Sequence, residues 1–281
     1  DPMAESTHDI TRYLPADLFE GRTVFVTGGG SGINLGIART FAALGANVGL
    51  CGRTQEKLDR AAEELEGIGA RVATAVADVR DADAVEKALE TTRTELGPVG
   101  VLVCGAAGNF PSPAEQLSAK GFKAVVDIDL LGSFNACRAA FEQLRDTSGS
   151  IIFISAGQAF TPYYAQAHVG AAKAGVDQLM RNLALEWGPF GIRANSIAPG
   201  PIEGTEGMRR LAPGETHERL RRAVPLQRFG TVDEIGSAAA FLASPLAAYV
   251  TGCVLVVDGG QNLPGSGVNT SILLDALSSD G

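Results

Sequence analysis

A lysine and a histidine lie close together in the segment AQAHVGAAKAG (165–175), whose small residues predict a helix. The ammonium group of Lys173 can hold an anion or a hydroxyl group. His168 carries an imidazole, a type of group that can relay a proton. Neighbouring residues on a helix point about a quarter-turn or more apart, so His168 equally fits a structural place that faces away from the chemistry. Val169, one helical turn before Lys173, has no group that can move a proton.

The sequence contains no other recognisable set of catalytic or metal-binding residues. There is no Ser-His-Asp set and no metal-ligand spacing, and His8, His168 and His217 are too scattered to predict a metal site. We therefore expect no metal. The four cysteines lie in apolar runs and predict reduced, buried thiols of an intracellular protein. They are Cys51, Cys104, Cys137 and Cys253.

A glycine-rich segment, TGGGSGINLG (27–36), follows an apolar run and begins a helical pattern. Its glycines let the chain turn tightly and approach a pyrophosphate, and the N–H groups at the start of the helix favour an anion. A glycine-rich turn alone is weak, but strand, turn and helix are the context that dinucleotide binding requires. The expected contacts to the cofactor in this turn are Gly28, Gly30, Ser31, Gly32 and Ile33.

The end of the second apolar run indicates which dinucleotide binds. The run ends LCGRT, with Arg53 and no acidic residue beside it. An acid here would bind the ribose 2′-hydroxyl of NADH, whereas a guanidinium suits the 2′-phosphate of NADPH. We predict NADPH, although a solvated arginine at the start of a helix would look the same. Asp78, followed by Val79, closes the third run and either accepts a hydrogen bond from the adenine amine or caps the next helix.

Seven short apolar runs alternate with longer helical patterns. The runs are rich in Val, Ile, Leu and Ala, which is typical of parallel strands covered on both faces. Segments between them, such as QEKLDRAAEELEGIG, show apolar residues at helical spacing with charges opposite. The pattern predicts an α/β fold: a single-domain, Rossmann-type, doubly wound parallel sheet of about seven strands with helices on both faces. The expected strands cover 23–27, 47–52, 71–78, 100–107, 150–156, 192–199 and 253–260.

The predicted organisation has an N-terminal arm (1–20), a dinucleotide-binding domain (21–262) with a substrate lid near 201–225, and a C-terminal tail (263–281). The net charge of −9 argues against nucleic acid as a partner, because phosphate backbones need a basic surface. No stretch is long and apolar enough to cross a bilayer, and no signal peptide is recognised. We therefore expect no membrane contact and a cytoplasmic location.

Several motifs together resemble the short-chain dehydrogenase/reductase family. Besides the glycine-rich turn they include NSIAPGPI (195–202) and VTGCVLVVDGG (250–260), and the resemblance covers about residues 20–262. Longer stretches such as AAGNFPSPAEQLS (106–118) and DIDLLGSFNACR (127–138) are similar to the 2,4-dienoyl-CoA reductases of the peroxisomal type and their bacterial relatives. The resemblance implies an NADPH-linked reduction of 2,4-dienoyl-CoA to 3-enoyl-CoA in fatty-acid β-oxidation, usually by a homotetramer.

The catalytic residues of the general family, Asn, Ser, Tyr and Lys, are only partly present. Lys173 matches the lysine, which in the family holds the ribose hydroxyls of the nicotinamide cofactor, so Lys173 is also an expected cofactor contact. The tyrosine place holds Val169, the serine place Ala156 and the asparagine place Asp129. An alcohol–ketone mechanism needs a phenol to move the hydroxyl proton, so these changes exclude it. The mitochondrial dienoyl-CoA reductases have an earlier tyrosine, at the place of Gln158. The peroxisomal type lacks both tyrosines and has an aspartate at the place of Asp129, so the departures point to that subfamily.

Reduction of a conjugated thioester does not need a tyrosine. Hydride adds to the far carbon of the diene, negative charge moves to the thioester oxygen, and a carbon is protonated. Asn109 matches the family's carbonyl-binding asparagine and is expected to donate to that oxygen; a turn-forming asparagine is the alternative. Asp129 and Lys173 are expected to position the proton-donating water, because an ionised carboxylate accepts rather than donates hydrogen bonds. The alternative for Asp129 is a purely structural partner of Lys173.

Further residues complete the expected site. Pro199, Gly200 and Ile202 match the family's loop around the nicotinamide amide. The segment EGMRRLAPGETHERLRR (206–222) carries five arginines, which either bind the phosphates of CoA or belong to a solvated amphipathic helix. The expected substrate-binding residues are Asn109, Phe110, Gln166, His168 and Arg209.

Three hypotheses about function follow. The leading one is an NADP-dependent oxidoreductase that acts on CH–CH bonds, the dienoyl-CoA reductase. A trans-2-enoyl-CoA reductase, or another oxidoreductase of the same family, shares the transfer of hydride to an acceptor. The non-enzyme alternative is a cofactor-binding protein that has lost turnover, and the retained Lys173 and Asn109 argue against it.

Overall fold

A single parallel sheet organises the chain in the computed structural model, which describes residues 9–205 and 215–264. Its seven strands run in the order β3-β2-β1-β4-β5-β6-β7, and each neighbouring pair is parallel. The predicted fold class is therefore confirmed, and each of the seven expected runs overlaps a strand. The strands are β1 Thr23–Thr27, β2 Asn47–Gly52, β3 Val72–Val76, β4 Val99–Cys104, β5 Ser150–Ile154, β6 Arg193–Pro199 and β7 Val254–Val257.

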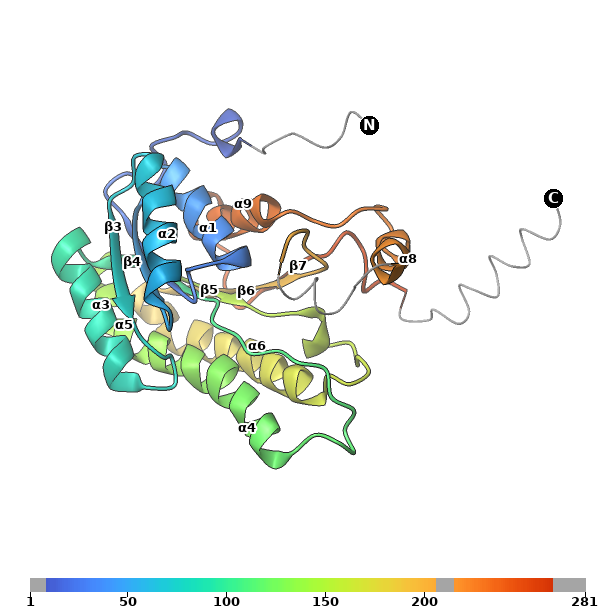
Figure 1. Cartoon of the computed structure of the whole chain (residues 1–281). Helices are drawn as coiled ribbons and strands as arrows, with labels where there is room; N and C mark the ends of the chain where they lie inside the picture. The colour runs from blue at the N-terminus through green and yellow to red at the C-terminus, as the bar shows by residue number, and fades with distance from the viewer. Residues whose placement is uncertain (1–8, 206–214, 265–281) are drawn as a thin grey trace.

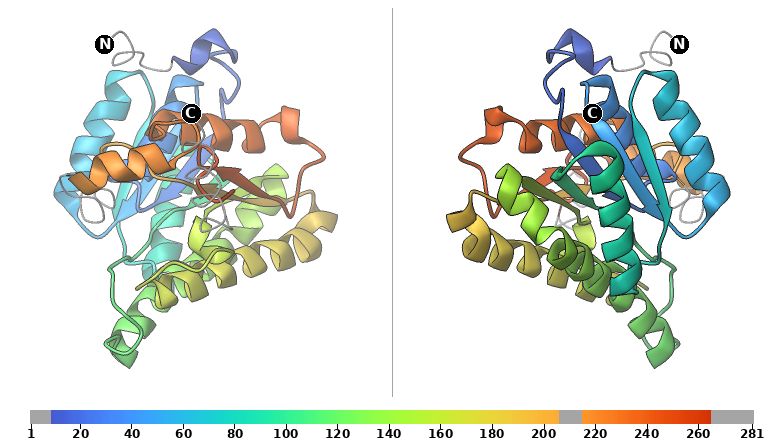
Figure 2. Two further views of the ribbon diagram at one scale, coloured as in Figure 1. Left: turned by 90° about the vertical axis from the view of Figure 1, so that its right-hand side faces the viewer. Right: turned by 90° about the vertical axis from the view of Figure 1, so that its left-hand side faces the viewer.

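Helices cover both faces of the sheet (Figures 1 and 2). One layer consists of α1 (Gly32–Ala43), α2 (Gln55–Gly67) and α9 (Val232–Ala243), and the other of α3 (Ala82–Leu96), α5 (Gly132–Thr147) and α6 (Ala167–Trp187). Because β1, β4 and β5 lie between two layers, every residue in β1 and β4 is buried, which explains their continuous apolar sequences. The remaining described elements are α4 (Ala119–Val126), α8 (Glu215–Ala223), the π-helix η2 (Asp127–Leu131), and the short helices η1 (Ile10–Arg12), η3 (Gly157–Ala159), η4 (Gly188–Phe190) and η5 (Pro245–Ala247).

The crossovers change direction between β1 and β4, and this switch point is where doubly wound sheets bind ligands. The last residue of β1, Thr27, is level with Cys51 on one side and Cys104 on the other, so three strands end together. The Thr27 hydroxyl accepts hydrogen bonds from the N–H groups of Gly105 (3.0 Å) and Ala106 (3.2 Å). The loop after β4 is thereby held beside the glycine-rich turn that follows β1.

Two residues of the expected N-terminal arm lie in the core. Ile10 and Phe19 are buried against the layer that contains α1. The proposed boundaries at residues 20 and 262 stay predictions, and most of the expected tail lies outside the described residues. Within the described ranges, no helix has both the length and the hydropathy to cross a bilayer. The cytoplasmic location stays a prediction.

Candidate active site

The glycine-rich turn between β1 and α1 is shaped to receive an anion. Gly28 and Gly32 have φ angles of 68° and 59°, which other residues rarely adopt. The Gly28 N–H donates to the Cys51 carbonyl at 2.8 Å and ties the turn to the end of β2. Ser31 is the N-cap of α1, but among the described residues its side chain makes no capping hydrogen bond. The N–H groups of the first turn of α1 therefore remain for a ligand.

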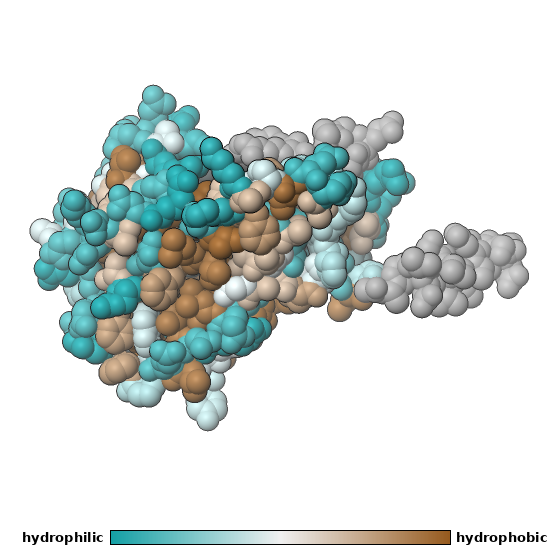
Figure 3. All heavy atoms as spheres, turned by 90° about the horizontal axis from the view of Figure 1, so that it is seen from below, coloured by the Kyte–Doolittle hydropathy of each residue, from teal (hydrophilic) through white to brown (hydrophobic). Residues whose placement is uncertain are grey.

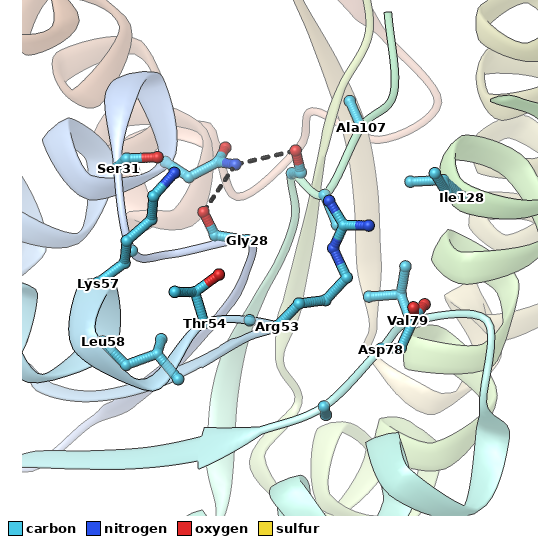
Figure 4. Close-up of a pocket in the computed structure, with 16 residues that line it drawn as sticks. Gly28, Ser31, Arg53, Thr54, Lys57, Leu58, Asp78, Val79, Ala107 and Ile128 are labelled. Carbon is cyan, nitrogen blue, oxygen red and sulfur yellow. Dashed lines mark hydrogen bonds between the residues drawn. The ribbon is translucent and has the colours of Figure 1, made fainter.

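A cavity of about 330 Å³ opens beside this turn (Figure 4). Its walls come from the turn itself, from the ends of β2 and β3, and from the loop after β4. This concave shape, with a helix N-terminus on one side and cations on another, fits a dinucleotide. The predicted cofactor residues that line it are Gly28, Gly30, Ser31, Arg53, Asp78 and Val79.

Two exposed cations, one in the β2–α2 connection and one in the first turn of α2, project toward the cavity. Arg53 follows β2, and Lys57 lies one helical turn later in α2 and extends toward Ser31 (Figure 4). A Cβ atom on Gly30 would come within 3.1 Å of the Lys57 Cβ, so the glycine allows α2 to lie against the turn. The sequence analysis did not identify Lys57 as a cofactor contact. The available signal was its position four residues after Arg53, which places the two cations on the same side of the chain.

Asn34 joins the two loops that meet at the switch point. Its side-chain amide donates to the Gly105 carbonyl at 2.9 Å and to the Gly28 carbonyl at 3.3 Å (Figure 4). A Cβ atom on Gly105 would come within 2.0 Å of the Asn34 Oδ1 atom, so a larger residue there would displace the Asn34 amide from this position. Sequence reasoning missed this contact, although an amide side chain inside a glycine-rich segment was visible.

The structure separates the two roles that the sequence offered for Asp78. Helix α3 is capped by Asp81, whose carboxylate accepts the Ala84 N–H at 3.1 Å. The Asp78 carboxylate instead lines the cavity and is held by two nitrogens of Arg80, at 2.9 and 2.6 Å. The hydrogen bonds from Arg80 lower the pKa of Asp78 to about 2. The carboxylate is therefore an ionised acceptor at the place expected for adenine.

A buried ion pair joins Lys173 of α6 to Asp129 of the π-helix η2. The Lys173 Nζ atom lies 3.1 Å from the Asp129 Oδ2 atom, and the two side chains are 8% and 0% exposed. Lys173 also donates to the Ile154 carbonyl at 2.8 Å, and the other carboxylate oxygen, Oδ1, accepts the Gly108 N–H at 2.7 Å. Apart from this ion pair, Oδ2 has no hydrogen-bond partner among the described residues. A π-turn is a common device at functional sites, and here it places Asp129 under the lysine.

The loop after β4 carries Asn109 and is fixed on both sides of it. Gly108 is bound to Asp129, as described, and the Ser112 N–H donates to the Ala165 carbonyl at 2.9 Å. Between these points Asn109 is exposed. The structure thus brings Asn109, Asp129 and Lys173 to one region from three separate segments. Their roles, and those of the other predicted site residues, stay predictions.

Three further substrate-binding predictions meet in one place. The ring of Phe110 lies 4.5 Å from that of His168, and the Gln166 amide approaches the Phe110 carbonyl at 3.5 Å. His168 is fully buried beneath this contact. Arg209, the remaining predicted substrate residue, lies outside the described residues.

The loop after β6 and the described part of the lid are closely packed. The Gly200 N–H donates to the Val257 carbonyl at 2.9 Å, next to Pro199 at the end of β6. The Ile202 side chain is buried and lines a separate, mainly apolar cavity, so only its backbone can serve the predicted cofactor contact. In α8, Arg221 and Arg222 both pair with Glu218, at 2.7 and 2.9 Å. This pairing reduces the positive charge that α8 offers to phosphates.

Comparisons with known proteins agree with this architecture. A family model described as Enoyl-(Acyl carrier protein) reductase matches residues 28–262. The chain belongs to the short-chain dehydrogenase/reductase family. It is 45% identical over 249 residues to the peroxisomal 2,4-dienoyl-CoA reductase of Saccharomyces cerevisiae, which produces (3E)-enoyl-CoA, covering 87% of this chain and 85% of the relative.

Two more relatives place the chain within this family. It is 40% identical to a probable 2,4-dienoyl-CoA reductase of Bacillus subtilis, (2E)-enoyl-CoA-producing, covering 86% of this chain and 97% of the relative. A gluconate 5-dehydrogenase of Burkholderia cenocepacia, solved with NADP and tartrate, is 31% identical with a TM-score of 0.82, covering 88% and 97% of the two chains. The predicted resemblance is confirmed, and the protein is an oxidoreductase of the short-chain dehydrogenase/reductase family.

This short-chain reductase carries no hydroxyl at the tyrosine and serine places of its family. Val169 is buried in a small apolar cluster with Val125 and Ala172. A tyrosine side chain at this position would therefore have to displace these neighbours. One turn after Lys173 on α6 lies a second buried carboxyl, Asp177, which sequence reasoning missed. Burial raises the pKa of Asp177, and the hydroxyls of Ser196 and Ser155 act in the opposite direction. A carboxyl four residues after the lysine, in an otherwise apolar stretch, was the sequence signal.

Proposed function

We propose that this protein reduces 2,4-dienoyl-CoA thioesters to 3-enoyl-CoA with NADPH, as a step in the oxidation of unsaturated fatty acids. The observation that carries the proposal is the buried Lys173–Asp129 pair, which stands beside the Asn109 loop with no hydroxyl at the tyrosine place. A site of this kind can polarise a carbonyl and hold water, but it lacks the phenol that an alcohol substrate needs. Relatives named 2,4-dienoyl-CoA reductase support the same class of substrate.

NADPH, when bound, supplies the hydride. The protein's task is then to stabilise the charge that develops on the thioester oxygen and to protonate carbon. The exposed Asn109 amide is held in place by its flanking contacts and donates to that oxygen. A preorganised donor of this kind contributes about 3–4 kcal/mol to the barrier in other enzymes that form oxyanions.

The position of the proton donor decides the product. Protonation of the dienolate at the carbon next to the thioester leaves a 3-enoyl product, whereas protonation two carbons further along leaves a 2-enoyl product. The Asp129 carboxylate and the Lys173 ammonium, which form a buried pair, position a water beside the loop that carries Asn109. Because Asn109 holds the thioester end, a water on this side protonates the nearer carbon. We therefore propose the 3-enoyl product.

The preference for NADPH follows from charge at the end of β2. Arg53 and Lys57 both reach the cavity, whereas Glu56, which lies between them in the sequence, does not line it. The 2′-phosphate is the only part of NADPH that NADH lacks, and two cations favour it strongly over a hydroxyl. NADP bound to a relative of the same fold supports this choice.

Reduction of a medium-chain trans-2,trans-4-dienoyl-CoA should consume NADPH in equal amounts, whereas the matching trans-2-enoyl-CoA should react at most slowly. Loss of NADPH absorbance measures the rate, and loss of the conjugated thioester absorbance identifies the product, since a 3-enoyl thioester is no longer conjugated. Faster turnover of the 2-enoyl-CoA would favour the enoyl-CoA reductase, with which the family model's description agrees. Binding of NADPH without turnover of either thioester would support the non-catalytic alternative.

We also propose that the protein assembles as a homotetramer, because it exposes two apolar faces. One covers α4, α5 and α6 (Figure 3), and the other lies along the edge strand β7. Two different self-complementary faces generate a closed tetramer, and an unpaired edge strand needs cover. The larger exposed side chains of the first face are Phe122, Leu131, Phe134, Leu185 and Phe190, and Val256 belongs to the second.

Phe134→Glu should convert the tetramer into a dimer, because a charge in the centre of an apolar interface is left without a partner. Light scattering coupled to gel filtration measures the mass of each variant. Ile68→Glu, an exposed apolar residue at the end of α2 outside both faces, is the control and should leave the tetramer intact. A wild-type monomer, or a tetrameric Phe134→Glu variant, would contradict the proposal.

A further inference from the structure

Three buried polar atoms next to the Asn109 loop have no partner. They are both ring nitrogens of His168 and the Oε1 atom of Gln166, none of which is hydrogen-bonded to any described residue. Both side chains contact Phe110: the His168 ring packs on its ring at 4.5 Å, and the Gln166 amide nitrogen approaches its carbonyl at 3.5 Å. His168 is 0% exposed and Gln166 5% exposed. The two residues therefore form one unsatisfied polar cluster under a single aromatic side chain.

Such a cluster costs stability. A buried polar group without a hydrogen bond is destabilising, and groups of this kind in a native protein call for an explanation. The neighbouring backbone is strained as well, because Ala165 adopts a φ angle of 60°, which is uncommon for a residue other than glycine. Backbone strain and unpaired buried polar groups both lower stability, and where they occur together they indicate a functional site.

The chemistry of the cluster specifies what would satisfy it. Gln166 Oε1 is an acceptor, and a neutral imidazole offers one donor and one acceptor. A ligand group with one N–H and one C=O, that is, a secondary amide, pairs with both residues. Phe110 covers the cluster, is itself partly exposed, and follows Asn109 directly in the loop. A group that enters here lies close to whatever Asn109 binds.

We propose that Gln166 and His168 form a subsite for the amide nearest the sulfur in the pantetheine arm of acyl-CoA, with Phe110 as its cover. This proposal rests on the proposed function, in which Asn109 holds the thioester of an acyl-CoA. The first amide of CoA lies two carbons from the sulfur, so an oxygen bound at Asn109 brings this amide to the adjacent residue. Substrate binding displaces the Phe110 ring and supplies partners for Gln166 Oε1 and for one nitrogen of His168, and the subsite recognises CoA thioesters over other conjugated carbonyl compounds.

Matched small thioesters test the subsite. The 2,4-hexadienoyl thioester of N-acetylcysteamine keeps the first amide, and the S-pentyl thioester has the same chain length with methylenes in its place. The wild type should prefer the amide in kcat/KM by about tenfold, which is about what one buried hydrogen-bonded pair contributes. His168→Phe and Gln166→Leu should each bring this ratio close to one. Calorimetric affinities for the saturated hexanoyl analogues should show the same ratio without turnover.

A purely structural role predicts a different pattern. In that case His168→Phe lowers both kcat/KM values equally and leaves their ratio unchanged, which overturns the proposal, as does a wild-type ratio near one. His217→Phe is the matched control, because His217 also packs on a phenylalanine, Phe229, at 4.7 Å but belongs to α8, and it should not alter the ratio. If the wild type binds with the expected ratio but reduces no diene, the proposed function fails and the subsite stands.

Discussion

Lys173→Met is expected to lower kcat/KM for the dienoyl-CoA by about 10³-fold, within the range that positioned proton-transfer groups contribute. Lys173 is the cation that neighbours Asp129, and the side chain also reaches the Ile154 carbonyl at the end of β5. Its loss removes one of the two groups that hold the proton-donating water, together with the positive charge beside Asp129. Single-turnover kinetics with saturating NADPH measures the effect on the chemical step.

The same change should destabilise the fold, because it leaves the Asp129 carboxylate buried and unpaired. Breaking a buried ion pair in this way costs about 3–5 kcal/mol. The double variant Lys173→Met/Asp129→Asn removes both charges and keeps the amide oxygen that accepts the Gly108 N–H, so it should recover most of the lost free energy of unfolding. It should not recover turnover. A stable double variant with near wild-type turnover would exclude both residues from the chemistry and leave the structural role for Asp129.

Arg53→Glu is expected to lower affinity for NADPH by about 100-fold, or about 2.7 kcal/mol, and to leave affinity for NADH within a few fold. The variant places a carboxylate where the 2′-phosphate is expected, beside the cavity lined by Ser31 and Lys57. Fluorescence titration with each cofactor gives the two dissociation constants. Raising the salt concentration should reduce the wild-type preference, because Arg53 is exposed.

Arg60→Glu provides the charge-matched control for this change. Arg60 is an exposed arginine on the same helix, bound to the Glu56 carbonyl, and it does not line the cavity. It should leave the ratio of the two dissociation constants unchanged. Lys57→Ala should lower NADPH affinity in the same direction as Arg53→Glu, but by less. An Arg53→Glu variant that keeps its preference for NADPH would mean that Arg53 is a solvated helix-start residue.

The sequence by itself determined the seven strands, the two-sided helical cover and the glycine-rich turn. These features are local: a run of apolar residues such as 23–27 is buried on both faces wherever it lies in a parallel sheet, and a glycine with positive φ is needed wherever the turn occurs. The sequence also showed that Val169 and Ala156 replace the family's tyrosine and serine. These positions follow directly from their spacing relative to Lys173 and to the end of the fifth predicted strand.

Only the tertiary structure decided which distant side chains meet. The family resemblance paired Asp129 with Lys173, but the direct contact between these different helical segments, and the π-turn that allows it, came only from the structure. The structure also assigned the cap of α3 to Asp81 and left Asp78 to the cavity, since capping requires one particular backbone geometry at the helix start.

The unsatisfied state of His168 likewise has no signature in the sequence. From the sequence, His168 beside Val169 was consistent with a proton relay, but a structural place was favoured. Whether its nitrogens have partners depends on what packs against it, and Phe110 does so only because the loop after β4 lies on the start of α6. Local periodicity thus defines the elements of this protein, whereas the charges and polar groups that make its site depend on how those elements pack.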